Sequence, residues 1–252
     1  MSPKPYPFEL MISDGDPPKQ LFIQTVEQVL KENLQAPDSF GCQILDCHTH
    51  IGSKKHLSTF IEAELLFHNS YYNKGFAFLT AQKVNTYVTE KQFDQILLIG
   101  CETYCELFLC ETCGLLGGKD VDYCVFETVG RHQNRLRKLQ EWAVRHKSNW
   151  EKTLFIFVVP ISTTLSTHDK MIAYFKSTME LLVGKTKFKQ KFQLAHSKAL
   201  NFALILIGNA EKAKEYWTMD TEARKLRPVG TEHRFQELSQ DNPVYFFAHV
   251  SS

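Results

Sequence analysis

The chain has 252 residues, of which 43% are hydrophobic and 23% are charged, and its formal net charge is +1. This composition is ordinary for a globular protein of one large or two small domains, and so small a net charge favours no class of charged partner. No apolar run approaches the ~20 residues that a membrane-spanning helix requires. We therefore expect a soluble protein.

The N-terminus gives no sign of a targeting segment. Pro3, Pro5 and Pro7 interrupt the first ten residues, which lack the basic-then-apolar order of a signal peptide. We expect a cytoplasmic location on this basis.

The seven cysteines are an odd number and lie mostly in apolar segments. Both observations favour reduced, buried thiols over a disulfide framework. The cysteines are Cys42, Cys47, Cys101, Cys105, Cys110, Cys113 and Cys124.

The first third of the chain mixes a loose arm with helical and extended segments. Residues 1–20 are rich in Pro, Asp and Gly and are predicted to form the arm. Apolar spacing predicts a helix over 21–34 and a short strand over 42–47. A long helix is predicted over 58–87, with an interruption at 73–75.

From residue 95, apolar strands and helices alternate. Because the strands have few polar interruptions, both faces of their sheet should be covered. The alternation predicts an α/β fold in which a parallel sheet carries helices on both faces, and ligands of such sheets bind at the carboxyl ends of the strands. The predicted strands are 96–100, 121–126, 154–159 and 201–207, and the predicted helices are 105–116 and 171–182.

We divide the chain into three parts. An N-terminal arm and helix (1–40) precede the α/β domain (41–210), and a C-terminal extension (211–252) follows it. The extension ends in an apolar strand candidate, 243–252, that stops abruptly. This leaves open that the natural protein continues beyond it.

One predicted strand runs directly into a turn that is rich in hydroxyl groups. A strand, a tight turn and a helix N-terminus together bind phosphate well, because the first N–H groups of the helix are free and its dipole favours an anion. The alternative is an ordinary turn with an N-cap. We call residues 162–167 the phosphate loop; they are Ser162, Thr163, Thr164, Leu165, Ser166 and Thr167.

The order of these segments over residues 40–210 resembles the type I phosphoribosyltransferases, and the orotate enzymes most. In that family a loop after an apolar strand holds the 5-phosphate of phosphoribosyl pyrophosphate, and the resemblance gives this role to the phosphate loop. Residues 100–104 occupy the place of the pyrophosphate loop, which includes Cys101, Glu102, Thr103 and Tyr104. Residues 52–56 resemble the basic turn of the orotate enzymes.

The resemblance also implies basic residues that neutralise the pyrophosphate. Lys54 and Lys55 belong to the basic turn, and Arg131 and Arg135 follow Phe126, in the region that corresponds to the flexible hood of the family. The implied ligand is phosphoribosyl pyrophosphate or a nucleotide, with Mg²⁺ as the accompanying ion. The implied reaction is transfer or cleavage at the anomeric carbon of ribose.

The chain departs from the family pattern at one place. Val159 and Pro160 stand where the family has two acidic residues that hold the ribose hydroxyls, and neither side chain can accept a hydrogen bond. Glu102 is our candidate for a substitute catalytic carboxylate, and Glu127 and Asp169 are the alternatives. The missing pair also favours a second hypothesis, a non-catalytic nucleotide-sensing or interaction domain of a larger system.

A further hypothesis is a metal-dependent hydrolase. His48 and His50 form an HxH pair in a predicted strand, and alternation along the strand places both imidazoles on one side. Zn²⁺ held there would activate a water molecule, as in the amidohydrolases that this pair resembles. Those enzymes need further ligands at the ends of other barrel strands.

Two other patterns have simple structural interpretations. Cys110 and Cys113 have CxxC spacing, but no second CxxC follows and the pair lies in a predicted helix, which favours buried cysteines over a metal or redox site. The basic segments 128–150 and 185–192 suggest phosphate or nucleic-acid binding, with a solvated amphipathic helix as the alternative for the first. The sequence leaves open a homodimer or membership in a larger complex.

Overall fold

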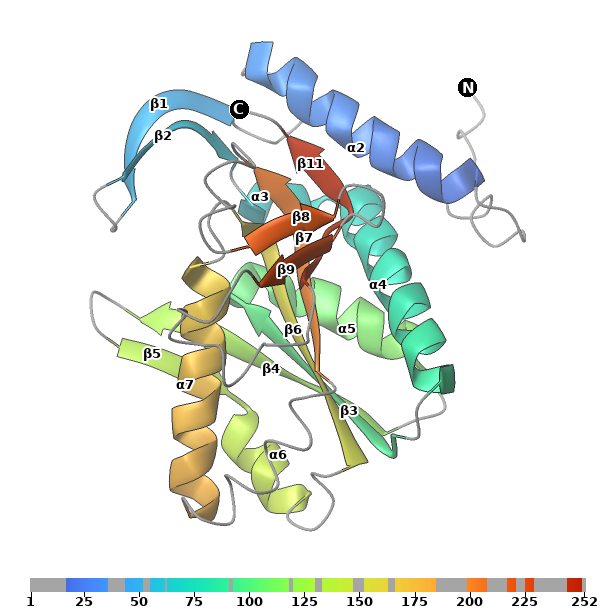
Figure 1. Ribbon diagram of the computed structural model, residues 1–252, viewed down its shortest axis with the longest axis vertical. Coiled ribbons are helices and arrows are strands. Elements are labelled where there is room, and N and C mark those ends of the chain that lie inside the picture. Colours follow the sequence, from blue (N-terminus) through green and yellow to red (C-terminus); the bar gives the residue numbers. More distant parts are fainter. Residues whose placement is uncertain are drawn as a thin grey trace.

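A computed structural model of the chain describes thirteen segments, and their central element is a mixed sheet (Figure 1). The order of its strands is β5-β4-β3-β6-β7-β10-β9-β8, and β11 also pairs with β7. The described residues are 17–35, 44–51, 55–61, 63–90, 93–117, 120–129, 133–146, 152–162, 166–184, 199–207, 217–220, 225–228 and 244–250.

The middle of the sheet is parallel. It contains β4 (Asp120–Val129), β3 (Gln95–Cys101), β6 (Thr153–Ser162) and β7 (Leu200–Ile207). Two short strands, β10 (Val244–Tyr245) and β11 (Ala248–Val250), are parallel to β7. All of β3 and nearly all of β6 are buried, as continuous apolar strands require.

Antiparallel strands extend the sheet at both edges. At one edge β5 (Gln133–Arg137) pairs with β4, and at the other β9 (Lys225–Pro228) pairs with β10 and with β8 (Trp217–Asp220). The segment predicted as an extension thus contributes strands to the main sheet.

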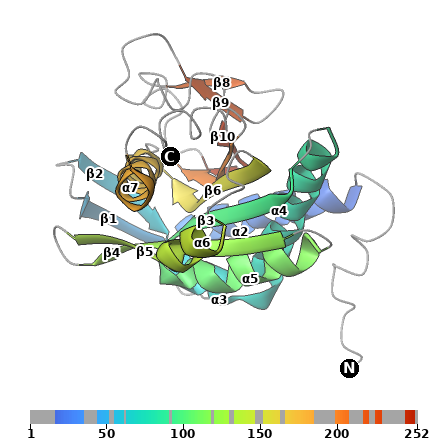
Figure 2. The same cartoon turned by 90° about the horizontal axis from the view of Figure 1, so that it is seen from below.

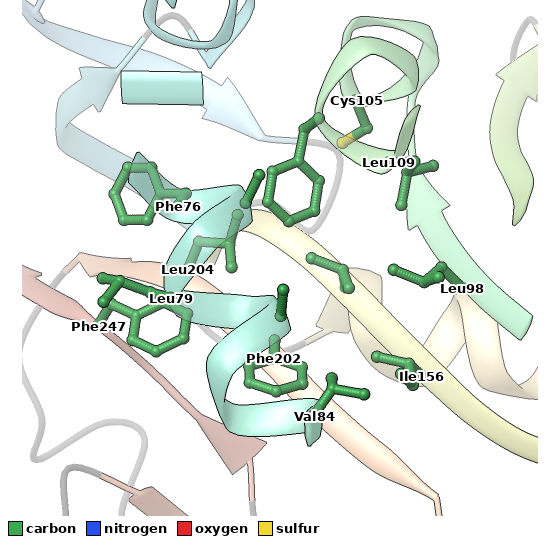
Figure 3. Close-up of a cluster of buried hydrophobic side chains, with 14 of the residues drawn as sticks. Phe76, Leu79, Val84, Leu98, Cys105, Leu109, Ile156, Phe202, Leu204 and Phe247 are labelled. Carbon is green, nitrogen blue, oxygen red and sulfur yellow. The ribbon is translucent and has the colours of Figure 1, made fainter. Parts of the chain in front are cut away.

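Among the described residues, alternation along the strands builds two large hydrophobic cores, and a small third cluster lies between β7 and residues 244–246. Leu98, Ile156 and Phe202 face α4 (Ser70–Glu90) and α5 (Glu106–Leu115), and Figure 3 shows how their side chains meet. On the same side lie α2 (Pro17–Gln35) and α3 (Ala63–His68).

The opposite face of the sheet is covered by α6 (Leu139–Arg145) and α7 (Ser166–Val183). Leu97, Phe155 and Phe157 face these two helices. Figure 2 shows α3 and α5 on one side of the sheet and α7 on the other. The predicted α/β fold, a parallel sheet with helices on both faces, is therefore confirmed.

The predicted helix over 58–87 is wrong at its start. Residues as far as Ile61 form β2 (Lys55–Ile61), which pairs with β1 (Ile44–Ile51) in a separate antiparallel sheet. The helical region then breaks at Asn69 and continues unbroken through 73–75. Gly75 is needed there for close packing, because a Cβ on it would lie 2.2 Å from the ring of Phe22 in α2.

The amphipathic helix proposed within 128–150 is also only partly correct. Leu136, within this segment, lies in β5 opposite Phe126, and the helix α6 begins at Leu139. Pairing with β4 extends the sheet by one strand, and this long-range gain overrides the local helical pattern. Among the helices of the described segments, none is long and apolar enough to cross a membrane.

Candidate functional site

The connections of the central strands define a switch point in the sheet. After β3 the chain crosses through α5 on one face to β4, and after β6 it crosses through α7 on the other face to β7. Since β3 and β6 are neighbours, the two crossovers start side by side at the carboxyl ends of these strands and then lead to opposite faces of the sheet. Open α/β sheets bind ligands at this kind of position, where the helices leave a crevice.

Glu102 follows β3 at this switch point and has an unusual backbone conformation. Its φ is 68° and its ψ is 156°, a region used almost only by glycine, and it costs about 1–3 kcal/mol for other residues. The Glu102 N–H donates to the carbonyl of Phe126 in β4 at 2.7 Å, and its carbonyl accepts from the N–H of Cys105 at 3.1 Å. Neighbouring elements therefore hold Glu102 in a strained turn, with a half-buried carboxylate at the crevice.

The Cys101 thiol and the Tyr104 hydroxyl, also in the predicted pyrophosphate loop, stay protonated at neutral pH. Burial raises the pKa of the Cys101 thiol well above its usual range, and the Glu102 carboxylate raises it further. Burial likewise raises the pKa of the Tyr104 hydroxyl, and the nearby thiols and carboxylates raise it further. Cys105 is buried and donates its thiol hydrogen to the Cys101 carbonyl at 2.6 Å. This segment therefore offers hydrogen-bond donors and one carboxylate, but no ready thiolate nucleophile.

Gly100 sets how closely α5 follows this turn. A Cβ at Gly100 would lie 2.7 Å from Cδ1 of Leu109, so a larger residue would push α5 away from β3. The short helix η1 (Thr103–Cys105) joins the turn to α5, and α3 packs against it. The predicted loop is thus positioned by two helices.

The phosphate loop spans the end of β6 and the start of α7. Ser162 is the buried last residue of β6, and Ser166 and Thr167 lie in the first turn of α7. Thr163, Thr164 and Leu165 lie outside the described residues. The strand and the helix occur where the sequence predicted them, and α7 directs its N-terminus toward the carboxyl end of the sheet.

Sequence reasoning missed a buried polar pair behind this loop. His168, in the first turn of α7, places Nε2 3.0 Å from Oδ1 of Asn201 in β7. Burial lowers the pKa of His168 to about 4, so the ring is neutral at pH 7. Its Nδ1 is buried and has no hydrogen-bond partner among the described residues. The available signal was an Asn in an otherwise apolar strand, which needs a partner when buried.

Asp169 is next to this histidine and is also perturbed. Burial raises the pKa of its carboxyl group to about 6. Val159 and Pro160 are both buried in β6, so the position of the missing acidic pair is apolar. Since β3 pairs with β6 only as far as Val158, the absent N–H of Pro160 removes no hydrogen bond to β3.

The basic candidates cannot be assigned to the site. Lys54 and Arg131 fall outside the described segments, and for Lys55 in β2 and Arg135 in β5 only the backbone is described. Arg135 lies opposite Glu127 in the ladder between β4 and β5. The basic segment 185–192 is likewise outside the described part of the chain.

The competing patterns belong to other elements than the two loops of the candidate site. The HxH pair belongs to β1, in the two-stranded sheet, and not to the parallel strands. Cys110 and Cys113 lie on α5, where Cys110 is exposed and Cys113 is partly buried, so the prediction of buried cysteines is wrong for Cys110. Cys110 lies on the solvent-exposed side of α5. Cys101, Cys105 and Cys124 are buried free thiols, as predicted.

No protein-family model matches the chain, and no curated protein matches it. The solved structures to which its fold is similar include several phosphoribosyltransferases, the class that the sequence resembles. Orotate phosphoribosyltransferase from Mycobacterium tuberculosis H37Rv is 7% identical over 92% of this chain and 96% of that one, with a TM-score of 0.43. The APRTase from Giardia lamblia, complexed with 9-deazaadenine, is 9% identical over 82% and 93%, with a TM-score of 0.41. Hypoxanthine phosphoribosyltransferase from Trypanosoma cruzi, complexed with the product IMP, is 12% identical over 72% and 74%, with a TM-score of 0.38.

Proposed function

We propose that this chain is a phosphoribosyltransferase-like protein that binds a phosphorylated ribose compound at the switch point between β3 and β6. The ligand is phosphoribosyl pyrophosphate or a nucleotide. One observation carries the proposal: the segments that the resemblance assigns to the pyrophosphate and to the 5-phosphate follow two neighbouring parallel strands whose crossovers diverge. Two segments of this kind at neighbouring strand ends suit a ligand that carries phosphate at two separate positions, as phosphoribosyl pyrophosphate does with its 5-phosphate and its pyrophosphate.

The phosphate end of the ligand would bind at the N-terminus of α7. This helix has 18 residues, its first N–H groups have no partner within the helix, and Thr167 brings a hydroxyl group to its first turn. The neutral state of His168 leaves this binding to the backbone and the hydroxyl groups, because an uncharged imidazole adds no positive charge.

Glu102 is the proposed catalytic carboxylate. It lies at the carboxyl end of β3, its side chain is only partly buried, and the position of the family's acidic pair is apolar in this chain. A carboxylate there can accept hydrogen bonds from ribose hydroxyls. It also suits Mg²⁺, which is commonly held by one or two carboxylates together with phosphate oxygens and water. Mg²⁺ would neutralise the charge of the pyrophosphate.

The test is calorimetric titration of the full chain with phosphoribosyl pyrophosphate and with nucleoside monophosphates. We expect the double variant Thr163→Ala/Thr164→Ala to weaken binding at least tenfold, about 1.4 kcal/mol. The control is Ser177→Ala/Thr178→Ala, which also removes two hydroxyl groups, but from α7 far from its N-terminus, and should leave binding unchanged. Absence of binding, or equal binding by both double variants, would refute the proposal.

The second candidate is a non-catalytic nucleotide-sensing domain. The buried apolar pair Val159 and Pro160 favours it, because no carboxylate there can hold the ribose hydroxyls. Product assays on the ligands that bind separate the two candidates. Release of pyrophosphate or of a free base that stops in Glu102→Gln indicates an enzyme, whereas tight binding without turnover indicates a sensor.

A further inference from the structure

A cluster of polar side chains lies at the opposite, amino-terminal edge of the sheet. Asp120 and Asp122 are two residues apart in β4, so alternation places them on the same face of the strand. That face also carries Cys124 and Phe126, which pack against α6, and His146 immediately follows the last residue of α6. The cluster therefore joins the start of β4 to the end of α6.

The three side chains approach one another without forming hydrogen bonds. Nδ1 of His146 lies 3.6 Å from Oδ2 of Asp120, and its Nε2 lies 3.8 Å from Oδ2 of Asp122. Both distances exceed those of N–H···O hydrogen bonds. One ligand atom from each of the three residues can be chosen so that all three atoms lie within 4.8 Å of one another.

His146 has a buried nitrogen that is left unsatisfied. Its side chain is only 11% exposed, and Nε2 is fully buried with no hydrogen-bond partner among the described residues. A buried polar atom without a partner costs about 1–3 kcal/mol, so it calls for an explanation. The His146 ring packs against the Trp142 ring, and the two ring centroids are 5.4 Å apart.

A second layer of side chains orients this imidazole. The Gln95 amide nitrogen lies 2.6 Å from Nδ1 of His146 and 3.5 Å from Oδ2 of Asp120, and the Gln95 amide oxygen accepts from the Thr153 hydroxyl at 3.1 Å. Metal binding through Nε2 requires a half turn of this amide, which presents its oxygen to Nδ1–H, frees the lone pair of Nε2 and gives up the 3.5 Å contact of the amide nitrogen with Asp120. Histidines that bind metals are held in this way, by an acceptor on the nitrogen that does not bind the ion.

We propose that Asp120, Asp122 and His146 bind a divalent transition-metal ion, with Gln95 as the positioning residue. One imidazole nitrogen and two carboxylate oxygens suit Zn²⁺ or Mn²⁺ better than Ca²⁺ or Mg²⁺, which prefer oxygen alone. Small side-chain rotations bring all three atoms to the ~2.1 Å that Zn²⁺ requires. This proposal is independent of the ligand at the carboxyl edge.

The ion would replace a weaker interaction and strengthen one part of the sheet. At present Nη2 of Arg145 lies 3.0 Å from Oδ2 of Asp122, so this guanidinium competes with the ion for the carboxylate. The pairing of β5 with β4 begins at Val125, and it leaves residues 120–124 of β4 uncovered on that side. A metal ion that bridges β4 and the end of α6 would stabilise residues 120–124 of β4, which β5 does not pair with.

The experiment is titration of the metal-free full chain with Zn²⁺ alone, followed by calorimetry and by thermal unfolding. We expect one site of micromolar affinity that involves these residues and a rise in Tm with Zn²⁺. Asp122→Asn and His146→Gln, which are close in size to the native residues, should each weaken this binding at least tenfold. Cys110→Ser and His68→Ala are the controls, because each removes a different and exposed metal-binding side chain. Both should bind Zn²⁺ as the wild type does.

Arg145→Gln provides a test that does not require disrupting the cluster. Because Arg145 is exposed and competes for Asp122, its removal should strengthen Zn²⁺ binding several-fold. An unchanged or weaker affinity in Arg145→Gln would overturn the proposal. So would Zn²⁺ binding that survives both Asp122→Asn and His146→Gln, binding that is lost in Cys110→Ser, or the absence of binding by the wild type.

Discussion

In the described part of the chain, two turns place a residue other than glycine at positive φ, and they differ in the contacts that compensate for the strain. Glu102 follows β3 with φ 68°, and Lys138 follows β5 with φ 69°. The Lys138 ammonium lies 2.6 Å from the Tyr123 hydroxyl and 3.1 Å from a Glu106 carboxylate oxygen. For the Glu102 carboxylate, the hydrogen bond described is a long contact of 3.9 Å with the Cys101 thiol.

The difference extends to the regions around the two turns. Close to Lys138, polar groups of α5 and β4 satisfy one another, as the contact between the Tyr123 hydroxyl and Glu106 at 3.0 Å shows. Close to the switch point, His168 has a buried nitrogen without a described partner, and Asp169 is desolvated. Strain, a buried nitrogen without a described partner and a desolvated carboxyl group thus occur together near the proposed ligand, a combination that is common at functional sites, although buried atoms without a described partner also occur at Asn73, Thr80 and His146.

The largest expected effect comes from removing the hydrogen bond that His168 does have. Asn201→Ala leaves both ring nitrogens of His168 without a described partner and opens a small cavity between α7 and β7. We expect it to lower the free energy of unfolding by about 2–4 kcal/mol. Urea unfolding monitored by circular dichroism measures this change. Gln82→Ala, at an exposed position of α4, should stay within about 0.5 kcal/mol of the wild type.

A loss in Asn201→Ala as small as that in the Gln82→Ala control would show that the pair behind the phosphate loop contributes little. The contrast between the two regions would then rest on Glu102 and Asp169 alone.

The pH dependence of stability gives the next effect, because His168 and Asp169 act in opposite directions. The native pKa of His168, about 4, is below its ordinary value of 6.5, so its contribution to stability is lost as the pH falls from 6.5 toward 4. The native pKa of Asp169, about 6, is above its ordinary 3.8, so its contribution is gained as the pH falls from 6 toward 4. The two contributions largely cancel in the wild type.

Asp169→Asn removes the contribution of Asp169 to the pH dependence of stability and leaves that of His168 without compensation. Between pH 6.5 and pH 4.5 we expect the variant to lose about 2 kcal/mol more of its free energy of unfolding than the wild type does. Urea unfolding at the two pH values measures the difference. Parallel pH profiles for the variant and the wild type would mean that Asp169 is solvated in the native state.

The main sheet was largely predictable from the sequence, and the hairpins were not. The strands from 96–100 to 201–207 are continuous apolar runs, and such runs indicate buried parallel strands wherever they occur. Leu136 and Phe60 instead lie in β5 and β2, because each strand has a partner in the fold, and their helix-like spacing could not reveal the partner. Local patterns report local preference, and pairing across the sheet overrides it.

The candidate site could be predicted in position but not in its energetics. Residues 100–104 and 162–167 were placed at strand ends by the order of the elements alone. The strain at Glu102 depends on a hydrogen bond to Phe126, 24 residues away by numbering, and the neutrality of His168 depends on its burial against Asn201. Neither dependence leaves a mark in a single sequence, since Glu and His are common at exposed turns and helix starts.

The smallest expected effect is also the most direct test of the comparison between the two turns. Glycine adopts the backbone conformation of Glu102 without strain, so Glu102→Gly should raise the free energy of unfolding by about 1 kcal/mol. Lys138→Gly relieves a milder strain but removes the contacts with Tyr123 and Glu106, so it should lower that free energy by about 1 kcal/mol. Chemical denaturation of the two variants measures both changes under one set of conditions.

The opposite signs of these two changes in the free energy of unfolding matter more than their sizes. A residue that destabilises its own fold is expected to serve another purpose. If that reason is ligand binding, the stabilised Glu102→Gly variant should bind phosphoribosyl pyrophosphate more weakly than the wild type, whereas Lys138→Gly should bind it normally. A loss of stability in both variants would instead show that the Glu102 carboxylate has a structural partner, and the two turns would then be alike. Gain of stability together with loss of affinity is the combination that only a functional role for Glu102 explains.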